Sequence, residues 1–122
     1  MTNDSRQALG ISGEDLACAE LQRRGYVIVK RRYRTRFGEI DIIAKDGPTT
    51  VFIEVKARMT QEFGGAAAAM TRWKQRRIAR MAVDYLARRN LHDCPCRFDV
   101  VAIDFNESEP RIIVYPNAFN AS

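Results

Sequence analysis

The spacing of hydrophobic and polar positions changes several times along the chain, and these changes predict a short series of helices and strands. The first element is a helix from Ser12 or Gly13 to Arg24, since Ser12 is a suitable N-cap. Gly25 follows at the place where a left-handed residue ends many helices. Glu14 falls on the apolar face of this helix. A carboxylate on an inward face needs a partner, so Glu14 is a candidate functional residue.

Five further segments are rich in β-branched and aromatic residues, which favour strands. They are Tyr26–Tyr33, Glu39–Ala44, Thr50–Lys56, Phe98–Phe105 and Arg111–Tyr115. A second helix is predicted between the third and fourth strands, with Thr71 as N-cap and one apolar stripe. The stripe consists of Ile78, Met81, Ala82, Tyr85 and Leu86.

The element order α-β-β-β-α-β-β predicts an α/β fold with one central mixed sheet flanked by helices. The second helix would form a right-handed crossover that makes Val51–Lys56 and Phe98–Phe105 parallel. We expect a single domain over residues 1–122, with residues 1–11 and 117–122 as flexible tails.

Composition limits the class of protein. A chain of 122 residues with 46% hydrophobic and 29% charged residues fits one globular domain. It has no apolar run of about 18 residues and no secretory signal, so neither a membrane span nor export is expected. Three cysteines in such a chain are typical of reduced thiols in a cytoplasmic protein.

The chain has a net charge of +5, and its positive residues are concentrated in two segments, residues 23–36 and 72–89, each with seven Lys or Arg. Aromatic residues are interleaved with them, which favours a surface that binds nucleic-acid phosphates. A merely solvated face is the simpler alternative. Trp73 is expected in the core rather than as a platform for bases. The residues expected to contact nucleic acid are Arg32, Arg34, Arg36, Arg58, Arg72, Lys74, Arg76 and Arg77.

A hairpin centred on Gly47-Pro48 gathers the candidate chemistry. An even-numbered turn there places Asp41 opposite Glu54 and Glu39 opposite Lys56, all on one side of the sheet. The Cβ atoms of such facing residues lie roughly 5 Å apart. The opposite face of the first strand is apolar and carries Ile40, Ile42 and Ala44.

Two carboxylates this close repel each other unless a cation lies between them. Asp41 and Glu54 therefore predict a site for Mg²⁺ or Mn²⁺, with the Val55 carbonyl and Glu14 as further oxygen ligands. Lys56 would project beside it and assist the attacking water. The alternative is an exposed ladder of cross-strand ion pairs.

Asp41 followed by Glu54-Val55-Lys56 resembles the D…ExK core of the restriction-endonuclease-like PD-(D/E)XK superfamily. The whole chain resembles the YraN-type family of small bacterial proteins. The segments that carry this family resemblance are Gly13-Glu14-Asp15-Leu16-Ala17, Gly38–Ala44, Phe52–Arg58, Phe63-Gly64, Arg97–Val101 and Asn117-Ala118-Phe119.

The resemblance implies a restriction-endonuclease-like fold, with Glu14, Asp41 and Glu54 as metal ligands and Lys56 as the catalytic lysine. Archaeal Holliday-junction resolvases are similar, because they also place a helix glutamate before the D…ExK hairpin. Ile40 departs from the superfamily pattern, which has proline there. Glu39 belongs to the narrower family pattern, and its role stays open.

The leading hypothesis is a Mg²⁺- or Mn²⁺-dependent endonuclease that hydrolyses phosphodiester bonds in DNA, including branched or structured DNA. A homodimer is one way for so short a chain to hold a duplex or junction. One alternative is a nucleic-acid-binding module that keeps the nuclease-like fold without catalysis. Another is a protein-interaction subunit whose basic face meets an acidic partner.

Overall fold

The computed structural model describes residues 3–58, 71–105 and 108–119, with the main chain alone for residues 3–12 and Arg58. The Phe63-Gly64 motif and residues 120–122 of the expected tail lie outside these ranges. The elements follow the predicted order α-β-β-β-α-β-β. They are α1 (Asn3–Arg23), β1 (Val27–Thr35), β2 (Gly38–Asp46), β3 (Thr49–Arg58), α3 (Arg72–Arg88), β4 (Cys96–Asp104) and β5 (Arg111–Tyr115).

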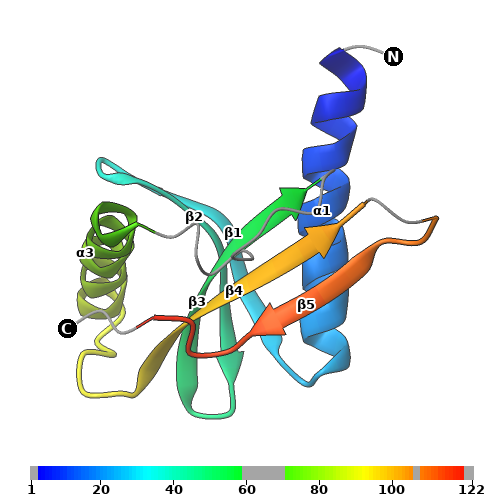
Figure 1. The fold of residues 1–122 in the computed structure, drawn as a ribbon. Helices are drawn as coiled ribbons and strands as arrows, with labels where there is room; N and C mark the ends of the chain where they lie inside the picture. Colours follow the sequence, from blue (N-terminus) through cyan, green and yellow to red (C-terminus); the bar gives the residue numbers. More distant parts are fainter. Residues whose placement is uncertain (1–2, 59–70, 106–107, 120–122) are drawn as a thin grey trace.

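The strands form one mixed sheet in the order β1-β2-β3-β4-β5, with a helix against each face (Figure 1). Only β3 and β4 run parallel among the described strands, as the crossover through α3 predicts. Within the described residues, no helix is both long and apolar enough to cross a bilayer. The α/β architecture expected from the sequence is therefore confirmed.

Each helix covers its own hydrophobic core. The α3 stripe packs on one face of the sheet against Ile43, Phe52 and Phe98. On the other face, Ala17 and Leu21 of α1 pack against Val51, Ile53 and their neighbours. Alternate residues of β3 thus serve opposite cores, and this alternation places Glu54 and Lys56 on the α3 side of the sheet.

The helix α1 begins at Asn3, nine residues before the predicted N-cap Ser12, and so includes most of the expected N-terminal tail. Glycine is unfavourable inside a helix, so a helix that starts at Ser12-Gly13 is the simpler expectation from the sequence. Gly13 has a packing role instead. A Cβ at this position would lie 3.3 Å from the Ala57 Cβ, so the missing side chain lets α1 approach the end of β3.

A buried polar cluster holds the opposite end of the sheet together. Asp99 is fully buried and accepts hydrogen bonds from the Tyr26 hydroxyl, the Arg97 Nε and the Asn117 N–H, each at 2.9 Å. Arg97 also reaches Asp46 at the hairpin end, at 3.0 Å. These bonds join β4, β2, the start of β1 and the segment after β5, so they fix the hairpin on which the candidate site is built.

Candidate functional site

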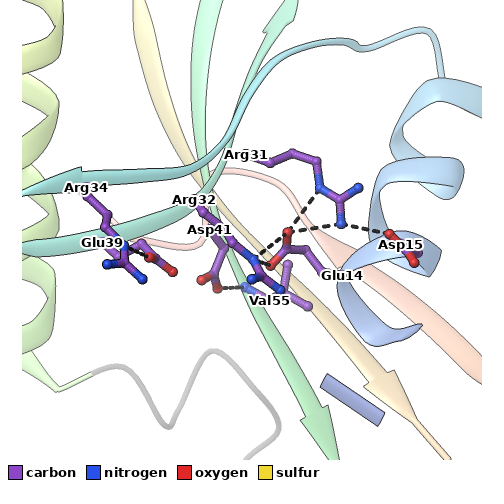
Figure 2. A network of polar contacts seen from close by, with 8 residues as sticks. All are labelled: Glu14, Asp15, Arg31, Arg32, Arg34, Glu39, Asp41 and Val55. Carbon is purple, nitrogen blue, oxygen red and sulfur yellow. Dashed lines mark hydrogen bonds and ion pairs between the residues drawn. The ribbon is translucent and has the colours of Figure 1, made fainter. Parts of the chain in front are cut away.

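The β2–β3 hairpin has the predicted register. Its ladder runs from Asp46–Thr49 to Ile42–Ile53 and leaves Gly47-Pro48 as the turn, with Gly47 at φ +61°. Beyond Ile42 the Asp41 carboxylate accepts the Val55 N–H at 2.8 Å (Figure 2). This side-chain bond takes the place of a backbone pair and fixes Asp41 beside Glu54.

Burial and mutual repulsion make this carboxylate pair hard to ionise. The pKa of Glu54 is raised from 4.5 to about 8, first by burial and then by the charge and hydrogen bonding of Asp41. Burial also raises the pKa of Asp41, although the Val55 N–H and the hydrogen bond from Glu54 oppose this. Near neutral pH the metal-free pair therefore keeps one proton between its two carboxylates.

Two lysines lie beside the pair. The pKa of Lys56 is lowered mainly by burial, and the positive charge of Lys74 on α3 lowers it further, while Glu54 opposes the change. Lys74 also acts on Glu54, where its charge lowers the pKa. Lys74 therefore lies close enough to both side chains for its charge to act on them.

The donor set fits a hard divalent cation. Asp41 and Glu54 supply adjacent carboxylate oxygens, and a cation between them would remove the repulsion that now retains a proton. The Val55 carbonyl stays a predicted ligand. Across the described part of the chain, no three Asp, Glu, His or Cys side chains are grouped as a ready metal site. Asp41 and Glu54 would therefore be its side-chain ligands, with water completing the coordination.

Glu14 lies near the pair but is held by arginines. Its residue is 7% exposed, and its carboxylate accepts from Arg31 Nε at 3.0 Å and from Arg32 Nε at 3.3 Å (Figure 2). Arg31 also bonds Asp15 at 2.8 Å. The negative charge of Glu14 contributes to the raised pKa of Asp41. A direct role for Glu14 as a metal ligand stays a prediction.

Two consecutive β1 residues, Arg31 and Arg32, reach the same carboxylate, which a regular strand does not allow. Arg32 has a φ of +54°, and this left-handed residue interrupts the alternation of side chains. Tyr33 and its partner Ile40 pack in the α3 core, whereas Ile42 packs with α1. The prediction that Ile40 shares a face with Ile42 and Ala44 is wrong, because the alternation of side chains along β2 breaks between Ile40 and Ile42.

Glu39 has an ordinary surface role in the structure. It lies opposite Arg34 in β1 and accepts a hydrogen bond from Arg34 Nε at 3.0 Å. Neither Glu39–Lys56 nor Asp41–Glu54 is a pair of the β2–β3 ladder as predicted, because the ladder ends at Ile42–Ile53 before reaching them. Glu39 acts on the site through its charge, which contributes to the raised pKa of Asp41.

The basic residues predicted to bind nucleic acid fall into two groups. Arg32 and Arg34 are paired with Glu14 and Glu39. In the described ranges, no carboxylate forms an ion pair with the other group, which consists of Arg36, Arg72, Lys74, Arg76 and Arg77. The side chain of Arg58, at the end of β3, is not among those described.

Arg76 and Arg77 of the second group line an arginine–aromatic groove of about 550 Å³, together with Phe37, Trp73 and Arg80. Trp73 is 66% exposed, so its predicted core position is wrong. It occupies the first turn of α3, off the apolar stripe that begins at Ile78. Helical periodicity should have placed Trp73 outside the core. The same periodicity puts Arg80 on the face of α3 that carries Trp73 and Arg77, so it would have identified Arg80 as a further residue of the groove.

Sequence comparison places the chain in a family. It belongs to the family described as "Uncharacterised protein family UPF0102", whose model matches residues 13–103. This range includes every segment of the family resemblance except Asn117-Ala118-Phe119.

Relatives of similar length carry the same family name. A UPF0102 protein of Geobacter metallireducens is 45% identical over 113 residues, covering 93% of both chains. One from Geobacter sulfurreducens is 47% identical over 112 residues, covering 91% of this chain and 88% of its own. One from Ralstonia pickettii is 52% identical over 102 residues, covering 80% of this chain and 81% of its own.

Proposed function

We propose that this member of the UPF0102 family is a divalent-metal-dependent nuclease that hydrolyses phosphodiester bonds in DNA, including branched or structured DNA. The observation that carries the proposal is the convergence of Asp41, Glu54 and Lys56 at one end of the hairpin. Among the described residues neither acid forms an ion pair with the two lysines beside it, and such an arrangement suits an anionic substrate and a divalent cation.

Each residue has a distinct role in this proposal. Asp41 and Glu54 would hold Mg²⁺ or Mn²⁺, and the Val55 N–H fixes the Asp41 carboxylate in position. The bound cation would polarise a phosphoryl oxygen and lower the pKa of water. Lys56 exchanges a proton more readily than an exposed lysine because burial lowers its pKa. Lys56 would therefore assist the attacking water, while Lys74 neutralises charge on the phosphate.

The resemblance to the PD-(D/E)XK superfamily supports this assignment independently of the local electrostatics. Its D…ExK pattern matches Asp41 and Glu54-Val55-Lys56. The mixed sheet with a helix on each face is compatible with the restriction-endonuclease-like fold that the resemblance implies. The arginines of α3 that form no ion pair within the described ranges provide positive charge on the side of the sheet where Glu54 lies.

A cleavage panel tests the proposal. Linear duplex, single-stranded and branched DNA would be incubated with the full chain and Mg²⁺, Mn²⁺ or EDTA. We expect metal-dependent products, and we expect Lys56→Ala to lose at least a factor of 10² in rate, as is usual for a lost proton-transfer group. Lys45→Ala is the matched control, because Lys45 lies on the same hairpin and bonds the Pro48 carbonyl at its far end.

Product formed equally by wild type and Lys56→Ala would contradict the proposed role of the lysine. The absence of product with every substrate and both metals would contradict the nuclease itself.

A second candidate is a nucleic-acid-binding module without catalysis. The lack of a ready three-ligand metal group among the described residues favours it. It predicts salt-sensitive DNA binding with no product in the same panel.

A further inference from the structure

The arginine–aromatic groove contains an exposed side chain that the proposed catalytic roles leave unused. Trp73 is 66% exposed at the start of α3, and its indole ring lies 4.6 Å from the Arg77 guanidinium carbon. Burying a side chain of this size usually contributes to folding. Leaving it in water gives up that contribution, so the exposed ring is available to a ligand.

Arg77 is held by packing, and no acidic partner for it lies in the part of the chain that the structure describes. Its side chain packs against Gly38, where an added Cβ would lie 3.7 Å from the Arg77 Cδ and Nε. The Nε atom is buried, and no acceptor for it exists among the described residues. The planar guanidinium lies over the Trp73 ring and adds a second flat, positively charged surface beside the exposed indole.

The surrounding charge favours an anionic occupant. Arg36 and Arg80 each lie 5.0 Å from the Phe37 ring, and neither forms an ion pair with a carboxylate in the described ranges. Nearby arginines outside the groove are neutralised, as Arg34 is by Glu39 and Arg88 is by Asp84. The first turn of α3 also lacks an acidic residue. Like charges repel in such an arrangement, and phosphates would relieve the repulsion.

Aromatic and guanidinium faces beside free positive charge are the combination that binds unpaired nucleotides, because bases stack while phosphates pair. In a duplex the bases are stacked on one another, so an exposed tryptophan would contribute little. An acidic peptide would satisfy the arginines but would leave the aromatic face unused. The groove therefore favours single-stranded nucleic acid.

The helical turn that carries Trp73 also carries a lysine of the proposed catalytic site. Lys74 follows Trp73 directly in α3, and the charge of Lys74 acts on both Glu54 and Lys56. A base on Trp73 would thus place a neighbouring phosphate near the acidic pair. We infer that Trp73 and Arg77 form a stacking site for an unpaired nucleotide, so that the substrate is DNA with unpaired bases beside the scissile phosphate. This inference rests on the proposed nuclease function for its substrate but not for the binding site.

The inference can be tested without cleavage, because Trp73 is the only tryptophan of the chain. Its fluorescence would be recorded while the full chain, in EDTA, is titrated with a short oligothymidylate. The comparison ligands are an abasic strand of the same length, a blunt duplex and polyglutamate. We expect saturable quenching by oligothymidylate and little quenching by the other three.

Affinities of labelled strands then separate stacking from charge. Trp73→Ala should weaken oligothymidylate binding by about 5- to 150-fold, the range for loss of one stacked base, and should leave abasic-strand binding nearly unchanged. Arg77→Gln should lose more affinity than the matched Arg88→Gln, since Arg88 is already paired with Asp84 on the same helix. Circular dichroism would confirm that each variant is folded.

The inference is overturned if oligothymidylate causes no quenching. It is also overturned if Trp73→Ala weakens both strands equally, or if polyglutamate quenches as strongly as oligothymidylate. Cleavage without base-dependent quenching would overturn the stacking site and keep the nuclease. Base-dependent quenching without cleavage would overturn the nuclease and keep the stacking site.

Discussion

Replacing Glu54 by glutamine should stabilise the metal-free protein at alkaline pH and leave its stability below about pH 4 unchanged. Glutamine keeps the shape of the side chain and models its protonated form. In the wild type the folded state holds the Glu54 proton up to a pKa of about 8, whereas the unfolded chain releases it near 4.5. The stability that comes from the neutral carboxyl is therefore complete below pH 4.5 and is lost as the pH rises toward 8.

The size of the effect follows from the same values. Each pH unit between 4.5 and about 8 costs the wild type about 1.4 kcal/mol relative to the variant, so the ceiling is about 5 kcal/mol. Glu54 is only half-buried, and water screens part of the cost. We expect Glu54→Gln to raise the free energy of unfolding by about 2–3 kcal/mol at pH 8–9.

Urea unfolding followed by circular dichroism, in EDTA at several pH values, measures this difference. Glu20→Gln is a control with the opposite sign, because Arg23 and Arg24 lower the pKa of Glu20 to about 2. The stability that the ionised Glu20 adds should be present above pH 4.5 and lost toward pH 2. Because the ion pair is exposed, this stability should amount to about 0.2–1 kcal/mol. If the difference between wild type and Glu54→Gln did not change with pH, the reasoning about Asp41 and Glu54 would be refuted.

Three other substitutions test the fold and the basic surface. Tyr26→Phe should cost about 1–3 kcal/mol of unfolding free energy, measured by urea unfolding, because buried Asp99 loses a hydrogen-bond donor; an unchanged midpoint would contradict this. Gly13→Val should cost about 1–3 kcal/mol in the same assay by forcing α1 away from Ala57, and a gain in stability would contradict the close approach. Arg76→Gln should reduce the slope of log affinity for DNA against log salt by about 0.7–0.9, and an unaltered slope would place Arg76 outside the interface.

The sequence was sufficient to predict the hairpin because its determinants are local. Gly47-Pro48 sets a two-residue turn, and strand periodicity then fixes the pairs from Asp46–Thr49 to Ile42–Ile53. The proximity of Asp41 and Glu54 follows from that register. The element order and the parallel pairing of β3 with β4 likewise follow from short-range patterns and a topological rule.

Other features depend on contacts between distant residues. Glu14 meets Arg31 and Arg32 across a gap of 17 and 18 residues, and the left-handed φ of Arg32 has no signature in its residue type. The break in alternation that separates Ile40 from Ile42 likewise has no signature in the strand pattern. The Asp99 cluster spans 73 residues to Tyr26, so a strand pattern alone could not identify its partners.

The central claim is that Asp41 and Glu54 together hold a divalent cation. Titration calorimetry of the full chain with Mn²⁺ near pH 7, in two buffers with different ionisation enthalpies, tests it most directly. Because the pKa of Glu54 is about 8, we predict that binding releases about one proton. Binding should be lost in Asp41→Asn, whose Val55 hydrogen bond can persist. The absence of Mn²⁺ binding by the wild type, or equal binding by Asp41→Asn, would contradict the claim.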